Sequence, residues 1–177
     1  MRLTFPLDGR AVLRPSVAAL ALALAFAPPG CNRKSNTHYA AVLQMADPQA
    51  QTQLVSGFYG VEAGAWRWTK QNFSVNLGLP LGAAQKGAWL RVRVTAPAAL
   101  IARLGTITLT ASVNGHRLTP ETYSAPGGYT YERDAPASML KDDYARVDFT
   151  LDKVMPAAGQ ELRDLGIVVS SAGLEPK

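Results

Sequence analysis

The chain is poor in the residues that build most catalytic and metal sites. Its 177 residues include one cysteine and two histidines. A single cysteine cannot form an internal disulfide bond. The histidines, His38 and His116, are far apart in the sequence, and no other histidine or cysteine stands at a metal-ligand spacing from either of them. A G-x-S-x-G nucleophile motif is also absent. The sequence therefore disfavours an enzyme and predicts no cofactor and no metal centre.

Charge is also sparse, at 18% of residues, and the formal net charge is +5. Part of the basic excess lies near the N-terminus at Arg2, Arg10 and Arg14, and the remainder is spread thinly, so no basic stripe indicates a nucleic-acid partner. Asp142 and Asp143 are adjacent acidic residues, but they lack the D-x-D spacing of a calcium loop. We expect this acidic pair to lie in a solvated turn.

Only one long apolar run is present, Ser16–Ala27, and it is too short to span a bilayer, which takes ~20 residues. The run follows the N-terminal arginines and precedes Gly30-Cys31, so the segment resembles a bacterial lipoprotein signal. Pro28 and Pro29 stand where such signals favour leucine and a small residue. The resemblance implies export to the cell envelope, on the periplasmic or outer-membrane face, with a lipid on Cys31 as the membrane anchor. An uncleaved anchor, or a secreted protein with a free thiol, is the alternative.

The sequence divides into a signal peptide over residues 1–30, a tether with a short helix over 31–53, and one domain over 54–177. Within 31–53, His38–Met45 is predicted to form one or two helical turns that end before Pro48, and Gln49–Gln53 a short helix or linker. In the domain, apolar and polar residues alternate, which is typical of strands with one buried face. The alternating segments are Phe73–Leu79, Leu90–Thr95, Ile107–Val113, Val147–Leu151 and Leu165–Ser170.

Turn residues support a sheet protein. Asn114-Gly115 predicts a tight hairpin, Ala98–Leu104 a helical turn over one end, and Tyr129–Arg133 a further short strand. The fold class predicted from these patterns is all-β: an antiparallel two-sheet β-sandwich of jelly-roll type.

Two patches resemble a known module. The first is Gly57-Phe58-Tyr59-Gly60-Val61-Glu62 followed by Arg67-Trp68, and the second is Glu161-Leu162-Arg163-Asp164-Leu165-Gly166. With Val113-Asn114-Gly115 between them, they resemble an uncharacterised bacterial exported β-sandwich module over Leu54–Leu174, whose second patch begins with aspartate where this chain has Glu161. The resemblance implies a galactose-binding-type jelly roll. If the first and last strands are adjacent, Glu62 and Arg163 would form a structural ion pair that joins the two ends.

The tryptophans are the strongest candidates for ligand binding, because sugar sites use flat aromatic faces with nearby polar groups. Trp66 and Trp68 share one side of a strand, and Trp89 shares a side with Arg91 and Arg93. These five residues predict a non-catalytic, envelope-anchored module that binds a carbohydrate or polysaccharide. The alternative is a structural lipoprotein that binds an envelope protein, with Trp66 or Trp68 capping the core and Trp89 covered by the N-terminal helix.

Overall fold

The computed structural model describes residues 38–177. The predicted signal peptide, Cys31 and the start of the tether lie outside the described residues. Within residues 38–177, no helix is long and apolar enough to cross a membrane.

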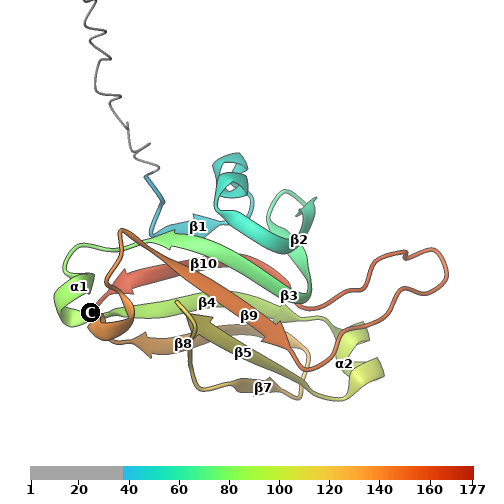
Figure 1. Cartoon of the computed structure of the whole chain (residues 1–177). Coiled ribbons are helices and arrows are strands. Elements are labelled where there is room, and N and C mark those ends of the chain that lie inside the picture. The colour runs from blue at the N-terminus through green and yellow to red at the C-terminus, as the bar shows by residue number, and fades with distance from the viewer. Residues whose placement is uncertain (1–37) are drawn as a thin grey trace, which may run out of the picture. The chain divides into compact units, whose positions relative to one another are not determined.

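The described residues form ten strands with four short helices between them (Figure 1). The strands are β1 (Val42–Gln44), β2 (Leu54–Glu62), β3 (Trp66–Gly78), β4 (Ala88–Ala96), β5 (Ile107–Val113), β6 (His116–Arg117), β7 (Glu121–Tyr123), β8 (Gly127–Ala135), β9 (Tyr144–Leu151) and β10 (Val168–Pro176). The helices are the 3-10 turns η1 (Pro48–Thr52) and η2 (Ala137–Met139) and the α-helices α1 (Ala83–Lys86) and α2 (Ala98–Leu104).

The strands form one continuous sheet that curls into the two layers of a β-sandwich, and every pairing is antiparallel. One layer contains β1, β10, β4 and β8, and the other contains β2, β3, β9 and β5 with the short β6 and β7. The long strand β3 belongs to both layers, because its first residues pair with β10 at Trp68–Val168 and its second half pairs with β9. The predicted fold class is therefore confirmed.

Alternation of apolar and polar residues explains the core. In β4, Leu90, Val92 and Val94 are buried, and in β5 the buried residues are Ile107, Leu109, Ala111 and Val113. The hairpin that joins β5 to β6 turns at Asn114 and Gly115, both at positive φ (47° and 82°), as a two-residue type I′ turn requires. The predicted helical turn is α2, with the predicted bounds.

The prediction of a helix over His38–Met45 is wrong. Val42–Gln44 forms β1, which pairs with β10, while Leu43 and Met45 are buried. A short apolar run is compatible with both the helical and the strand period. Here the segment is a strand because its backbone pairs with the edge of β10. The short helix occurs just afterwards, as η1, where the Asp47 side chain accepts a hydrogen bond from the Gln49 amide.

Residues before the predicted domain boundary at 54 also contribute to the sandwich. Leu43, Met45 and Ala50 belong to the buried core, and Gln53 is buried, where its amide group hydrogen-bonds to the backbone of Ala40 and Asn76. The segment over residues 42–53 is thus part of the folded domain.

Arg67, in β3, is a buried cation that no carboxylate pairs within the described residues. Its Nε donates to the Met45 carbonyl at 3.0 Å, and its Nη1 donates to the Tyr59 carbonyl at 3.0 Å and to Gln51 Oε1 at 3.1 Å. Burial lowers the pKa of this guanidinium. One side chain therefore joins the end of β1, η1 and β2 to β3.

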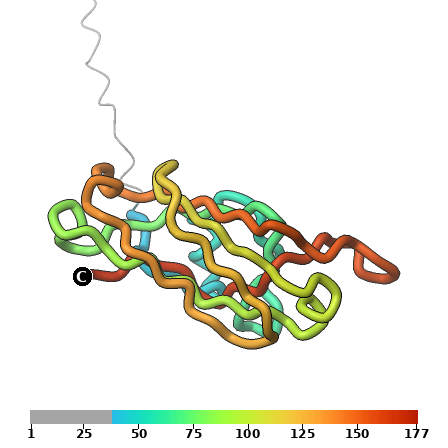
Figure 2. The backbone as a smooth tube through the Cα atoms, turned by 90° about the horizontal axis from the view of Figure 1, so that it is seen from below, coloured from blue at the N-terminus to red at the C-terminus, as the bar shows by residue number. Residues whose placement is uncertain are grey.

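The connection from β9 to β10, residues 152–167, extends beyond the strands in both views (Figures 1 and 2). Isolated bridges hold its two arms together, at Met155–Leu165 and Ala158–Glu161. The last strand begins at Val168 rather than at the predicted Leu165, because Leu165 bonds to Met155 across this loop.

Candidate functional site

The candidate binding residues of β4 lie on the solvent side of the first layer. Trp89, Arg91 and Arg93 alternate with core residues and are partly or fully exposed. Residues paired in an antiparallel ladder point to the same face. Ser171, Gly173 and Glu175 of β10 and Thr130, Glu132 and Asp134 of β8 therefore lie beside them on this face.

The other two tryptophans reach the same face through the strand that both layers share. Trp68 pairs with Val168, which in turn pairs with Thr95 of β4, so the Trp68 side chain points to the side of Trp89. Trp66 lies on the same side of β3, and the two indoles pack edge to face with centroids 6.1 Å apart. We call this surface, from Trp66 and Trp68 across Arg93 and Arg91 to Trp89, the outer β4 face.

All three tryptophans of the chain thus belong to one face, with aromatic rings at both ends of it. Trp89 and Thr95 are six residues apart on β4, which places the two ends about 20 Å apart along the strand. A surface of this length suits an extended ligand.

Ion pairs organise the middle of the outer β4 face. Arg91 donates from Nε to Glu132 and from Nη1 to Glu175, on the strands to either side. These hydrogen bonds raise the pKa of the Arg91 guanidinium. At the Trp89 end, the Lys177 ammonium lies 5.6 Å from the indole centroid and pairs with Asp134. Arg91 and Lys177 are therefore held in place before any ligand binds.

A pocket of about 260 Å³ opens between Arg91 and Arg93. Its lining residues are Val42, Arg91, Arg93, Thr130, Ser171, Gly173 and Glu175. Gly173 leaves room for this hollow and for the close approach of β1, because a Cβ at this position would lie 2.7 Å from Val42 Cγ2. Guanidinium donors, carboxylate acceptors and hydroxyl groups line this pocket. Such groups can hydrogen-bond to the hydroxyls of a hydroxyl-rich ligand.

Glu62 and Arg163 are in contact, with Arg163 Nη1 donating to Glu62 Oε1 at 2.7 Å. Arg163 also donates from Nε and Nη2 to the two oxygens of Glu161, at 2.8 and 2.9 Å. These bonds lower the pKa of Glu161 to about 2. The guanidinium lies 5.1 Å from the ring centroid of Tyr59, whose hydroxyl donates to the Asp164 carbonyl.

The role of Glu161 was missed in the sequence, where the residue was noted only as standing in place of an aspartate. In the structure, the Glu161 carboxylate folds back onto Arg163, two residues away. The network fixes the loop over residues 152–167 against β2, and a pocket of about 580 Å³ between Tyr59, Lys70 and Leu162 lies beside it.

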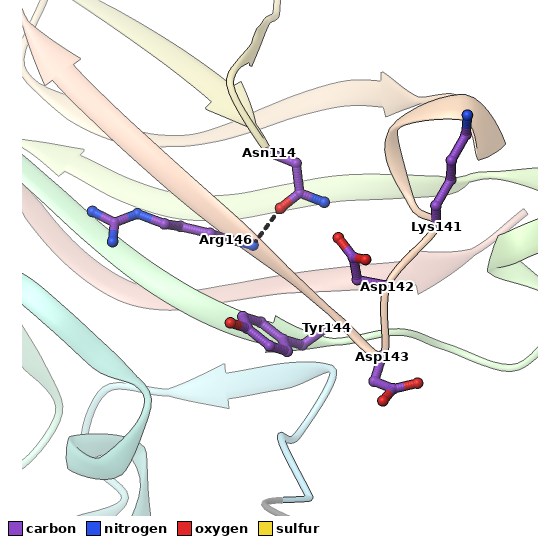
Figure 3. A pocket seen from close by; sticks show the side chains of 6 residues that line it. All are labelled: Asn114, Lys141, Asp142, Asp143, Tyr144 and Arg146. Atoms are coloured by element: carbon purple, nitrogen blue, oxygen red, sulfur yellow. Dashed lines mark hydrogen bonds between the residues drawn. The ribbon is translucent and has the colours of Figure 1, made fainter.

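A third pocket, of about 500 Å³, lies at the β5–β6 turn and the start of β9 (Figure 3). It is lined by Asn114, Lys141, Asp142, Asp143, Tyr144 and Arg146. The Arg146 backbone amide donates to Asn114 Oδ1 at 2.9 Å, and the two aspartates are exposed on the approach to β9. Among residues 38–177, no three histidine, cysteine, aspartate or glutamate side chains come together as a metal site would require.

No family model and no curated protein matches the chain. Among solved structures, a family 35 carbohydrate-binding module from Clostridium thermocellum is similar, with a TM-score of 0.45 and 10% identity over 76% of this chain and 97% of its own. A CBM4 structure has a TM-score of 0.39 and 14% identity, over 77% of this chain and 85% of its own.

An exo-β-1,3-galactanase from Phanerochaete chrysosporium, solved with β-1,3-galactotriose, has a TM-score of 0.38 and 10% identity over 77% of this chain. The match covers 29% of the galactanase, so this chain spans less than a third of that enzyme's length.

Proposed function

We propose that the domain is a non-catalytic module that binds a glycan across the outer β4 face. The observation that carries the proposal is the gathering of all three tryptophans with Arg91 and Arg93 on one side of one sheet. Aromatic rings stack on the apolar faces of pyranose rings, while fixed donors and acceptors between them select hydroxyl positions.

The rigidity of Arg91 also supports a binding site on this face. Arg91 is held by carboxylates from two strands, and its row of the sheet is bonded on both sides. Preorganised groups of this kind lose little conformational entropy when a ligand arrives. The distance of about 20 Å between the aromatic ends of the face suits a chain-like ligand rather than a small one.

The proposed location is the cell envelope, where a lipid on Cys31 would anchor the chain and the residues before the domain would form a tether. In that arrangement the module would hold a polysaccharide, or the assembly that contains it, close to a membrane surface. Resemblance to the exported module over Leu54–Leu174 fits the same placement.

The test is a glycan array probed with the full chain and with the variants Trp66→Ala, Trp68→Ala and Trp89→Ala. Tyr144→Ala is the matched control, because Tyr144 is also a partly exposed aromatic residue but lies on β9. The proposal predicts binding that weakens in the folded tryptophan variants and persists in Tyr144→Ala. Absence of glycan binding, or binding unaffected by all three tryptophan changes, would refute it.

A structural or protein-interaction lipoprotein is the second candidate, and one observation favours it. Leu162, at the far end of the β9–β10 loop, is 85% exposed although its neighbours Glu161 and Arg163 are held rigidly. An apolar side chain presented in this way can anchor a protein contact. A photo-crosslinker at position 162 that captures one defined envelope protein in intact cells, in a chain without glycan affinity, would favour this candidate.

A further inference from the structure

The outer β4 face has three cations, and two of them are paired with carboxylates. Arg91 is paired with Glu132 and Glu175, and Lys177 with Asp134. The third cation, Arg93, is exposed, and its guanidinium makes no hydrogen bond or ion pair within residues 38–177. Its charge and its donors are therefore available at the surface.

The two residues directly beside Arg93 in the sheet are uncharged and carry hydroxyl groups. Its direct cross-strand neighbours are Ser171 on β10 and Thr130 on β8. The carboxylates of this face lie further along their strands: Glu132 and Glu175 are bonded to Arg91, and Asp134 is paired with Lys177. Glu175 also lines the pocket, where its carboxylate is held by Arg91. All three residues of the Arg93 row line the pocket of about 260 Å³, so an incoming group would meet a guanidinium flanked by two hydroxyls.

Resting on the proposed function, we propose that this pocket binds an anionic substituent of the glycan, a carboxylate or a sulfate. A planar guanidinium with free donors can donate two parallel hydrogen bonds to two oxygens of a carboxylate or a sulfate. Charge-assisted hydrogen bonds of this kind are stronger than hydrogen bonds between neutral groups. Neighbouring hydroxyls can donate to the remaining oxygens. The ligand class is then an acidic polysaccharide rather than a neutral one.

The experiment measures the affinity of the full chain for two matched pairs of polymers by calorimetry. Polygalacturonate is compared with its methyl ester, which removes the carboxylate, and dextran sulfate is compared with dextran, which lacks the sulfate. We expect one charged polymer to bind at least about 10-fold more tightly than its uncharged partner. The pair that shows the difference identifies the anionic group.

Arg93→Gln removes the charge and should abolish that preference, so that the charged and the uncharged polymer bind with affinities within about twofold of each other. Arg93→Lys keeps the charge but not the planar fork, so it should restore only part of the preference. Arg117→Gln is the control, because Arg117 is an exposed arginine on β6 in the other layer and its loss changes the net charge equally. A melting temperature for each variant shows that it is folded.

Two outcomes separate this inference from the proposed function. If charged and uncharged polymers bind equally, and Arg93→Gln changes neither, the anionic pocket is refuted while glycan binding stands. If neither these polymers nor any array glycan binds, both proposals are refuted. If Arg117→Gln reduces the preference as much as Arg93→Gln does, the effect is one of net charge, and the assignment to Arg93 is wrong.

Discussion

Replacing Arg67 with methionine should destabilise the domain by about 3 kcal/mol. Methionine keeps much of the apolar stem but removes three hydrogen bonds, two of them to the backbone carbonyls of Met45 and Tyr59. A hydrogen bond from a charged donor contributes ~1.5 kcal/mol at the low end. We count only the two carbonyls, because Gln51 is exposed and water can replace the donor to it.

Urea unfolding measures this loss. With a slope of ~2 kcal/mol per molar, a loss of about 3 kcal/mol lowers the midpoint by about 1.5 M. Arg93→Met is the matched control, because the same change at an exposed position should stay within about 0.5 kcal/mol. Arg67→Lys should also be clearly destabilised, since one ammonium cannot reach both carbonyls and Gln51 as the fork does. The reasoning is refuted if Arg67→Met unfolds at the midpoint of the unsubstituted chain.

Three further predictions concern buried hydroxyls, pH and the anchor. Tyr123→Phe should leave stability unchanged or raise it by up to about 1 kcal/mol, because the buried Tyr123 hydroxyl has no hydrogen-bond partner among residues 38–177. Tyr131→Phe should cost about 1 kcal/mol, because it removes the hydrogen bond to the Thr119 carbonyl. Thermal unfolding of both variants tests the contrast, and equal costs would contradict it. Because the pKa of Glu161 is lowered to about 2 in the folded state, its contribution to stability is complete above a pH of about 4.5 and is lost as the pH falls toward 2. Glu161→Gln should therefore flatten the dependence of stability on pH in this range. An unaltered dependence would rule the contribution out. Cys31→Ser should move the chain from the membrane fraction to the soluble fraction and change its electrophoretic mobility, and an unchanged distribution would exclude lipidation.

Much of the fold follows from local pattern. Alternation over Ile107–Val113 gave β5 its bounds, and Asn114-Gly115 gave the turn after it, because both signals act over a few residues. The same rule put Trp89, Arg91 and Arg93 on the polar side of β4. The backbone of a strand points successive side chains to opposite faces of the sheet, so the face of each residue does not depend on what the strand packs against.

What the sequence did not provide depends on partners far along the chain. Arg91 meets Glu132 and Glu175, which are 41 and 84 residues away, and no local signal selects them. The placement of Trp68 on the same face as Trp89 needed the pairing of β3 with β10 as well as that of β10 with β4. The burial of Arg67 was missed for the same reason, since its acceptors come from three other segments.

The most direct test of the central claim uses the indole N–H signals of the three tryptophans in a nitrogen–proton NMR spectrum, each assigned by a Trp→Phe variant. Because the chain has no other tryptophan, these signals report on the outer β4 face alone. On adding the glycan selected by the array, the account predicts that the signals of Trp89 and Trp68 shift while the signals of residues in the pocket of Figure 3 stay in place. A glycan that binds but leaves all three indole signals unmoved would contradict the account.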